Sequence, residues 1–215
     1  MKRVFALVLF GCLLFSLSSA SAYVVSHRFL IPNTTYTVEI PWRFATQSTN
    51  ANEFEPFIYE YAGDLETSYQ LLEKRNVDIV SIDPDDDSIV LYVFVSNITD
   101  PFRKPIEQVS DETYSSFASD LADGFYSSNK QYGIIPLNQE KKYEIVNFEH
   151  TRAIKFQNAS YDDIVLEQLY FIFTNNSYIE FNFQYRNSDK VFSNQQIVED
   201  IMNSIQDGYM YYPNP

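Results

Sequence analysis

Residues 164–186 read IVLEQLYFIFTNNSYIEFNFQYR, and they indicate the class of fold. Two segments rich in β-branched and aromatic residues flank Asn175-Asn176, so we expect an antiparallel hairpin with its turn at this pair. In the second segment, apolar side chains alternate with Glu180, Asn182 and Gln184, which we expect to face water. The apolar residues of that segment, which we expect to face a core, are Ile179, Phe181, Phe183 and Tyr185.

Other parts of the chain predict further strands. Residues 36–40 alternate apolar and polar side chains, as a strand with one buried face does. Residues 89–95 are apolar without alternation, which predicts a central strand covered on both faces. The polar residues 45–55 predict a loop. The remaining predicted strands are residues 57–61, 77–82, 143–148 and 152–157, with turns at 83–87 and 149–150.

The first clear helix is predicted to run from Ser110 to about Tyr126. Ser110 is a favourable N-cap, and Asp111 and Glu112 complement the helix dipole. The apolar side chains of this segment recur with the 3.6-residue period of an amphipathic helix. They are Tyr114, Phe117, Ala118, Leu121, Ala122 and Phe125.

A second helix is predicted from Ser193, which forms an S-x-x-Q capping box with Gln196. We expect it to stop near Gly208, because glycine is common just beyond a helix end. Residues 64–75 fit either a helix or a strand. The buried stripe of the second helix is predicted to be Ile197, Val198, Ile201, Met202 and Ile205.

Together these elements predict an α+β fold, in which two helices bury their apolar stripes against a meandering antiparallel β-sheet. A β-sandwich with peripheral helices is the alternative. We expect residues 23–206 to form a single domain and residues 207–215 to form a flexible C-terminal tail.

In this arrangement the chain resembles the PsbP-like family, over roughly residues 28–206. The resemblance rests on the strand YTVEIPW at residues 36–42, on a central helix before long hairpins, and on the hairpin at residues 170–185 before a closing helix. The matching residues of that helix are Phe192, Ile197, Ile201, Met202 and Ser204-Ile205. The resemblance implies an α-β-α sandwich that serves in docking or assembly, with no catalytic residue to transfer and no specific support for photosystem binding.

The first 22 residues have the pattern of a secretory signal peptide. Lys2 and Arg3 precede an apolar run, which is followed by the small residues at positions 18–22. We therefore expect cleavage after Ala22 and a secreted or extracytoplasmic protein that is not transmembrane after cleavage. Lipid anchoring through Cys12, which follows Gly11, is the alternative. An uncleaved anchor is disfavoured because the run is shorter than the roughly 20 residues needed to span a membrane.

Charge and cysteine content narrow the classes of partner. The net charge is −14, and loss of Lys2 and Arg3 with the leader makes it −16. Such a chain repels phosphate backbones, so we expect no nucleic-acid partner. Cys12 is the only cysteine, so the mature domain has no disulfide and its core must hold it together. We expect a monomer without a cofactor, whose partner is an unidentified protein or surface polymer.

The acidic turn at residues 83–87 offers the one candidate metal site. Asp83, Asp85 and Asp87 have the alternate spacing of a Ca²⁺ loop. Ser88 stands where such a loop needs Gly, and Phe94 where it needs a bidentate Glu. We therefore interpret these residues as a solvated hairpin turn, with Ca²⁺ binding as the alternative.

Catalytic motifs are not found. His27 and His150 lack metal-ligand spacing, and there is no G-x-S-x-G motif and no Gly-rich phosphate loop. We predict no catalytic residue and interpret His150 as a surface imidazole in a turn. The function that the sequence favours is an exported, non-catalytic binding or assembly module. An extracellular hydrolase that uses paired carboxylates is the alternative.

Two further groups of residues bear on surface chemistry. Four N-x-S/T sequons could carry glycans, and three of them, Asn33, Asn158 and Asn175, are predicted in loops or turns. The fourth is at Asn97. Aromatic residues around a polar loop could anchor a partner, although we expect Trp42 to pack in the core. These are Trp42, Phe44, Phe54 and Phe57.

Overall fold

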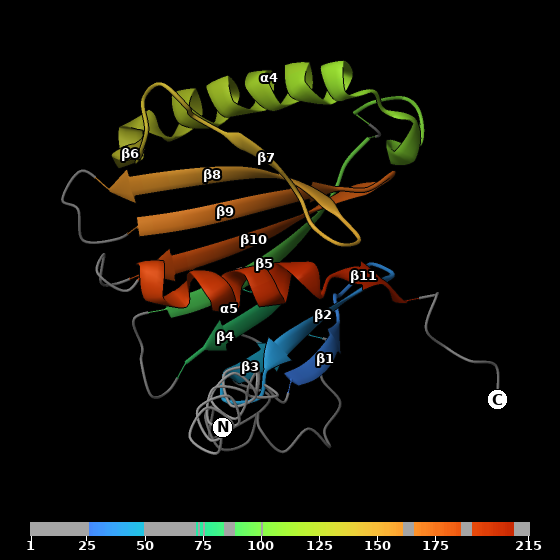
Figure 1. Cartoon of the computed structure of the whole chain (residues 1–215), viewed down its shortest axis with the longest axis vertical. Helices are drawn as coiled ribbons and strands as arrows, with labels where there is room; N and C mark the ends of the chain where they lie inside the picture. The colour runs from blue at the N-terminus through green and yellow to red at the C-terminus, as the bar shows by residue number, and fades with distance from the viewer. Residues whose placement is uncertain are drawn as a thin grey trace, which may run out of the picture.

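The computed structural model describes residues 26–49, 72, 74, 76–83, 89–99, 101–160, 166–185 and 191–208. Within these residues an eight-stranded antiparallel sheet has the order β3-β4-β5-β10-β9-β8-β6, and β7 also pairs with β8 (Figure 1). Its strands are β3 (Ala45–Ser48), β4 (Ile79–Ile82), β5 (Ile89–Asn97), β6 (Ile134–Pro136), β7 (Glu144–Asn147), β8 (Arg152–Ser160), β9 (Leu166–Phe173) and β10 (Ser177–Tyr185).

A smaller sheet of three strands has the order β1-β2-β11, and helices complete the fold. The strands are β1 (Ser26–Leu30), β2 (Tyr36–Pro41) and β11 (Gln206–Asp207). The helices are α4 (Asp111–Asn129) and α5 (Val191–Asn203), with single 3₁₀ turns η1 (Ile106–Gln108) and η2 (Lys130–Tyr132).

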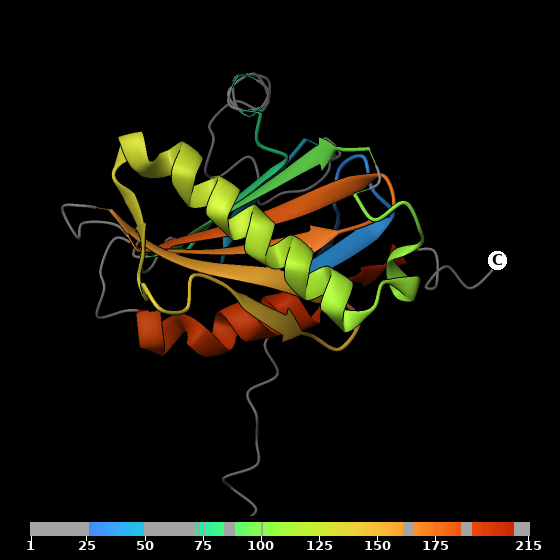
Figure 2. The same cartoon turned by 90° about the horizontal axis from the view of Figure 1, so that it is seen from above.

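The large sheet separates two hydrophobic cores. On β9, Leu169, Phe171 and Phe173 pack with α4, whereas Tyr170 and Ile172 pack with α5 and the small sheet. This is the two-residue period of a strand with both faces buried. The architecture is therefore an α+β sandwich, with α4 on one side of the sheet and α5 on the other (Figures 1 and 2). The sequence prediction of the fold class is confirmed.

The hairpin predicted at residues 164–186 is confirmed. Tyr178 pairs with Phe173, so the turn consists of Thr174 to Ser177. The Ser177 amide donates to Thr174 Oγ1 at 3.0 Å, and the Thr174 amide donates to the Ser177 carbonyl at 2.8 Å. Ile179, Phe181, Phe183 and Tyr185 are all fully buried.

The prediction that the other face of β10 meets water is wrong. Asn182 is only 9% exposed, and Glu180 and Gln184 are half-buried. Alternation on one strand records polarity but cannot show that aromatic neighbours shield the polar side chains. Here Glu180 lies between Phe94 of β5 and Phe171 of β9, its directly opposite residues.

The predicted helices form, with different boundaries. Ser110 caps α4 by accepting from the Thr113 amide, as expected. The capping box at Ser193 is wrong, because α5 begins at Val191 and Ser193 lies inside it. Gly208 does not stop the helix either, since α5 ends at Asn203 and β11 intervenes. Val198, Ile201, Met202 and Ile205 are buried and Ile197 is half-buried, in agreement with the predicted stripe.

Three smaller expectations also need correction. Residues 45–48 form β3 rather than a loop, because Thr46 pairs with Ser81 through a 2.8 Å hydroxyl hydrogen bond inside the sheet. Trp42 is 54% exposed rather than packed in the core, whereas Phe44 is buried. Asp207, expected in the tail, pairs with Tyr36. The leader at 1–22, the strand expected at 57–61, Phe54 and residues 209–215 lie outside the described residues.

Candidate functional site

A groove of about 500 Å³ lies at one end of the large sheet. The first turn of α4, η1, the turn between β7 and β8, and the start of β2 all contribute to its walls. These elements meet at the right-hand end of the molecule in Figure 1. The lining is divided almost equally between aromatic or aliphatic side chains and polar ones. The first group is Tyr36, Ile106, Val109, Tyr114, Phe148, Ile172 and Phe173, and the second is Glu107, Asp111, Asn147, His150, Thr151 and Arg152.

Side-chain hydrogen bonds fix the loops that form the groove. Asn175, in the turn between β9 and β10, accepts from the Ile106 amide at 3.2 Å and so holds η1 in place. On the opposite wall, the Glu149 amide donates to Asn203 Oδ1 at 3.3 Å, which ties the β7–β8 turn to the end of α5. One wall is thus tied to the β9–β10 turn and the other to the end of α5, so the groove is formed in the chain without a ligand.

The start of β2 is held in a third way. The Gly208 amide donates to the Thr35 carbonyl at 2.6 Å, and a Cβ at Gly208 would lie 2.7 Å from that oxygen. A side chain at this position would therefore force the two segments apart. The approach of residue 208 to Thr35 places Tyr36 at the groove with Asp207 opposite it.

Arg152 is the central charged residue of the groove. Its Nη1 lies 2.9 Å from Asp111 Oδ1, and its guanidinium stands 4.1 Å from the centre of the Tyr114 ring. Burial raises the pKa of Tyr114 to about 12, against the opposing effect of Arg152. Arg152 Nε and Thr151 Oγ1 are enclosed and have no hydrogen-bond partner within the described structure. The guanidinium thus fastens the beginning of β8 to the beginning of α4.

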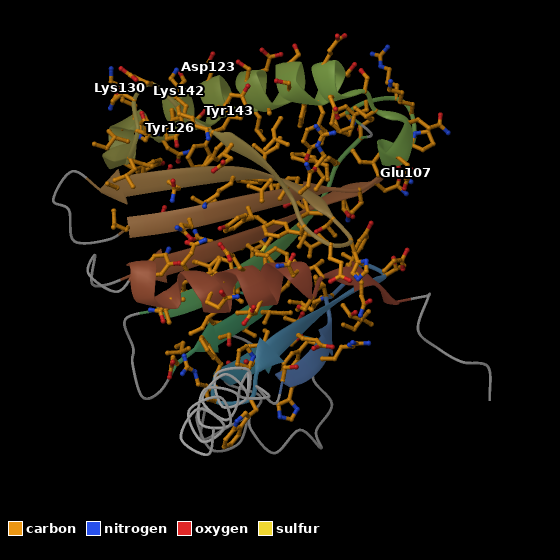
Figure 3. All side chains as sticks on the ribbon, viewed as in Figure 1. Glu107, Asp123, Tyr126, Lys130, Lys142 and Tyr143 are labelled. Atoms are coloured by element: carbon orange, nitrogen blue, oxygen red, sulfur yellow. The ribbon has the colours of Figure 1, made fainter. Side chains whose placement is uncertain are left out.

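Tyr36 forms the part of the groove nearest to the small sheet. Burial raises the pKa of its phenol, and the carboxylates of Asp207 and Glu107 raise it further. Two acidic side chains from separate elements therefore act on one aromatic ring. Glu107 itself is exposed at the groove rim, and Figure 3 shows it at the opposite end of α4 from Lys130 and Lys142.

The residues singled out from the sequence fall in different places. His150 lies in the turn between β7 and β8, as expected, and is exposed, with Nε2 3.6 Å from Glu149 Oε1. It does line the groove, which the sequence did not predict. His27 lies on β1 and does not line it. Among the described residues that line the groove, no nucleophile is hydrogen-bonded to His150, so these residues form no Ser–His–acid arrangement.

The acidic turn differs from the expected solvated segment at its first residue. Asp83 is 2% exposed, and its Oδ2 lies 3.0 Å from Arg43 Nη2. The charge of Asp83 is therefore compensated by Arg43. This ion pair is a structural contact between the end of β4 and the segment after β2. Asp85 and Asp87 lie outside the described residues, and no cluster of three metal-ligating side chains occurs within those that are described.

Two of the four sequon asparagines, Asn158 and Asn175, also make hydrogen bonds that hold parts of the fold together. Asn158, expected in a loop, lies within β8 and is 1% exposed, so a glycan has no access to it in the folded chain. Its Oδ1 accepts from the Tyr126 hydroxyl at 2.7 Å. Asn33, Asn97 and Asn175 are exposed, in agreement with a surface position.

A pair of acidic side chains on neighbouring strands is the nearest match to the predicted carboxylate pair. Burial raises the pKa of Glu180 to about 7, and the charge of Glu167 adds to the shift. Burial also raises the pKa of Glu167. Neither residue lines the groove. The groove therefore does not present this carboxylate pair to a ligand.

A second, much smaller cavity of about 90 Å³ lies at the other end of α4. Two of its three lysines form ion pairs, Lys142 with Asp123 at 2.7 Å and Lys141 with Glu144 at 3.1 Å. Figure 3 shows Lys142 and Asp123 together at that end, with Tyr143 beside them. The volume holds little more than a few water molecules, so the larger groove is the better candidate site.

Comparisons with known proteins support the fold. No family model and no curated protein sequence matches this chain. The solution structure of cyanobacterial PsbP (CyanoP) from Synechocystis matches with a TM-score of 0.53 and 13% identity, over 88% of this chain and 96% of that one. The chain therefore has the PsbP-like fold that its sequence resembles. The match does not identify a partner.

Two further solved structures match less closely. A protein from Bacteroides thetaiotaomicron is 9% identical, with a TM-score of 0.46 over 84% of this chain and 47% of that one. The Ran-binding protein Mog1p of Saccharomyces cerevisiae is 8% identical, with a TM-score of 0.42 over 86% and 96%. Among the described residues, no helix has the length and apolar character required to cross a membrane.

Proposed function

We propose that this chain is an exported, non-catalytic binding or assembly module, and that the groove holds a segment of a partner protein. The observation that supports the proposal is the groove itself, whose walls are tied down by side-chain hydrogen bonds and whose lining combines aromatic and aliphatic side chains with polar ones. A partner side chain that buries aromatic and aliphatic surface there would gain about 25 cal/mol per Å². Preorganised loops lose little conformational freedom when a partner binds, so more of that gain remains as affinity.

The chemistry of the lining favours binding over turnover. Its charged groups are either paired with each other, as Arg152 and Asp111 are, or exposed at the rim, as Glu107 is. A catalytic site would instead hold a nucleophile or carboxylate within hydrogen-bond reach of a base. The side chains of the groove serve to fix walls and to offer contact surface.

Site-specific photo-crosslinking tests this role. A photoreactive amino acid is placed at His150 on the groove rim, and at Lys130 as a control, since both positions are exposed. Lys130 lies at the far end of α4 (Figure 3). Expressed in the native host, the His150 variant should yield a discrete crosslinked protein that mass spectrometry identifies, and the Lys130 variant should not. No adduct from His150, or the same adduct from both positions, contradicts the proposal.

Export is tested separately, on the mature N-terminus. The leader pattern at residues 1–22 predicts that protein recovered outside the cytoplasm begins at Tyr23. Protein sequencing of that fraction decides the point. A first residue at lipid-modified Cys12 would replace secretion by membrane anchoring, and an intact Met1 would contradict both.

A further inference from the structure

Some of the described charged side chains around the groove have an ion-pair partner within the protein, and others do not. Asp111 pairs with Arg152, and His150 lies beside Glu149. Among the described residues that line the groove, Glu107 is the charged side chain for which the structure shows no ion-pair partner. A ligand entering the groove therefore meets one uncompensated negative charge.

Tyr36 lies beside that charge, because Glu107 and Tyr36 line the same groove and the carboxylate of Glu107 helps to raise the pKa of the Tyr36 phenol. Tyr36 itself is half-buried and presents an aromatic ring. A carboxylate beside an aromatic ring forms a site suited to a guanidinium or ammonium group, because the ring face attracts cations as well.

The remainder of the lining sets the surroundings of such a cation. Ile106 and Val109 continue from Glu107 along the same wall, and Phe148 stands on the wall formed by the β7–β8 turn. In a bound segment, these side chains would pack against the apolar residues that neighbour its Arg or Lys. A volume of about 500 Å³ accommodates more than one side chain, so a short extended segment fits better than an isolated ion.

An anionic occupant fits less well. Arg152 already contacts Asp111 and Tyr114, so its charge is partly compensated before a partner carboxylate arrives. The net charge of −14 also repels anions and steers cations toward the surface.

We propose that the groove binds an Arg or Lys side chain of a partner segment, with Glu107 and the ring of Tyr36 contacting the cation and the apolar wall receiving its neighbours. This inference rests on the proposed function and specifies the chemistry of the partner. Glu107 is exposed, so its charge contributes specificity and a modest part of the affinity, while the apolar wall contributes the larger part.

The test uses a phage-displayed library of random linear peptides, selected on the full chain. Enriched peptides are synthesised, and their Kd values are measured by fluorescence anisotropy for the unmodified protein, Glu107→Gln and Glu112→Gln. Glu112 is a matched control, because it is also an exposed acid near the start of α4 but does not line the groove. Competition against His150 photo-crosslinking identifies the peptides that occupy the groove.

We expect groove-binding peptides to carry Arg or Lys next to an aromatic or aliphatic residue. Their Kd should rise about three- to tenfold in Glu107→Gln and stay within about twofold in Glu112→Gln, and it should rise with salt concentration. Groove-binding peptides that are acidic or neutral, or equal effects of the two substitutions, overturn the inference and leave the binding role intact. If no peptide competes for the groove and His150 yields no adduct, the proposed function itself fails.

Discussion

The two faces of the large sheet bury different numbers of apolar side chains. Among the described residues, the core under α5 and the small sheet is the larger one and includes the fully buried Ile79, Leu91 and Phe183. Two buried polar residues on this face, Ser81 and Gln168, are hydrogen-bonded within it. The core under α4 is smaller, and Asn158 and Asn182 are buried beside it. The α4 side also contributes Ile106 and Val109 to the groove.

This difference separates stability from function. Every buried apolar side chain contributes free energy to folding, whereas each buried polar group must find a partner or lose free energy. Asn182 Oδ1 on the α4 face and Asn194 Nδ2 on α5 are both enclosed without a hydrogen-bond partner within the described structure, so the larger apolar core of the α5 face is the main difference between the two faces. We infer that the α5 face supplies most of the stability, and that the α4 face tolerates polar and titratable groups at some cost.

The largest effect is expected on the α5 face. Ile201 is 1% exposed in the middle of α5, so Ile201→Ala should lower the free energy of unfolding by about 2–5 kcal/mol through lost burial and cavity formation. Urea denaturation measures the change. The matched substitution Leu121→Ala, at a half-buried position on α4, should cost less. An equal or larger loss at Leu121 would reverse the comparison.

The next largest effect on stability depends on pH and comes from Glu180, on the α4 face of the sheet. The pKa of Glu180 is raised to about 7 by burial and then by Glu167, so folding favours its protonated form. Its contribution to stability is fully present below its unfolded pKa of roughly 4.5 and is lost as pH rises through 7. Stability should therefore fall from about pH 5 to pH 8, by at most about 3 kcal/mol from this residue.

Glu180→Gln removes the titration and isolates this contribution. Urea denaturation at several pH values should show that the variant gains stability relative to the unmodified protein as pH rises from 5 to 8. Parallel pH profiles for the two proteins would mean that Glu180 is not protonated in the folded state near neutral pH.

A smaller effect is expected at the buried amide of β8. The Tyr126 hydroxyl donates to Asn158 Oδ1 at 2.7 Å, so Tyr126→Phe leaves that oxygen without its bond and should cost about 1–2 kcal/mol. Tyr143→Phe is the control, because its hydroxyl donates to the Ser115 carbonyl at an exposed site. Thermal and urea unfolding should show little change in the control, and equal losses would argue against a special cost at Asn158.

The smallest effect concerns the acidic turn. Because Asp83 is buried against Arg43, we expect millimolar Ca²⁺ to leave the melting temperature nearly unchanged. One-site binding at a hundredfold excess over Kd would add about 2.7 kcal/mol and a rise of several degrees. A saturable rise that disappears in Asp85→Asn would establish a metal site and contradict this expectation.

The sequence predicts the elements better than their surroundings. The periodicity of apolar residues predicted β10 and α4 correctly, because the spacing of side chains along a strand or helix determines which of them share a face. It could not show that Glu180 and Asn182 lie against aromatic neighbours, since burial of the second face depends on packing between distant segments. Trp42 and Asn158 were misplaced for the same reason: an aromatic residue favours burial and an asparagine favours a turn only on average.

The groove could not be predicted from the sequence. Its residues come from β2, η1, α4, the β7–β8 turn and β9, which are distant along the chain. No short motif connects Tyr36, Glu107 and Arg152. The one signal was the unusual aromatic content, which predicts apolar contact surface without showing where it lies.

The central claim is that the groove, at the end of the sheet, is the binding surface. Amide ¹H–¹⁵N spectra recorded during titration with the enriched basic peptide test it most directly. The account predicts shifts concentrated at Tyr36, Glu107, His150 and Arg152, with the amide of Val198 in α5 unchanged. Shifts centred on Lys141 and Lys142 at the other end of α4, with the groove residues unchanged, would contradict it.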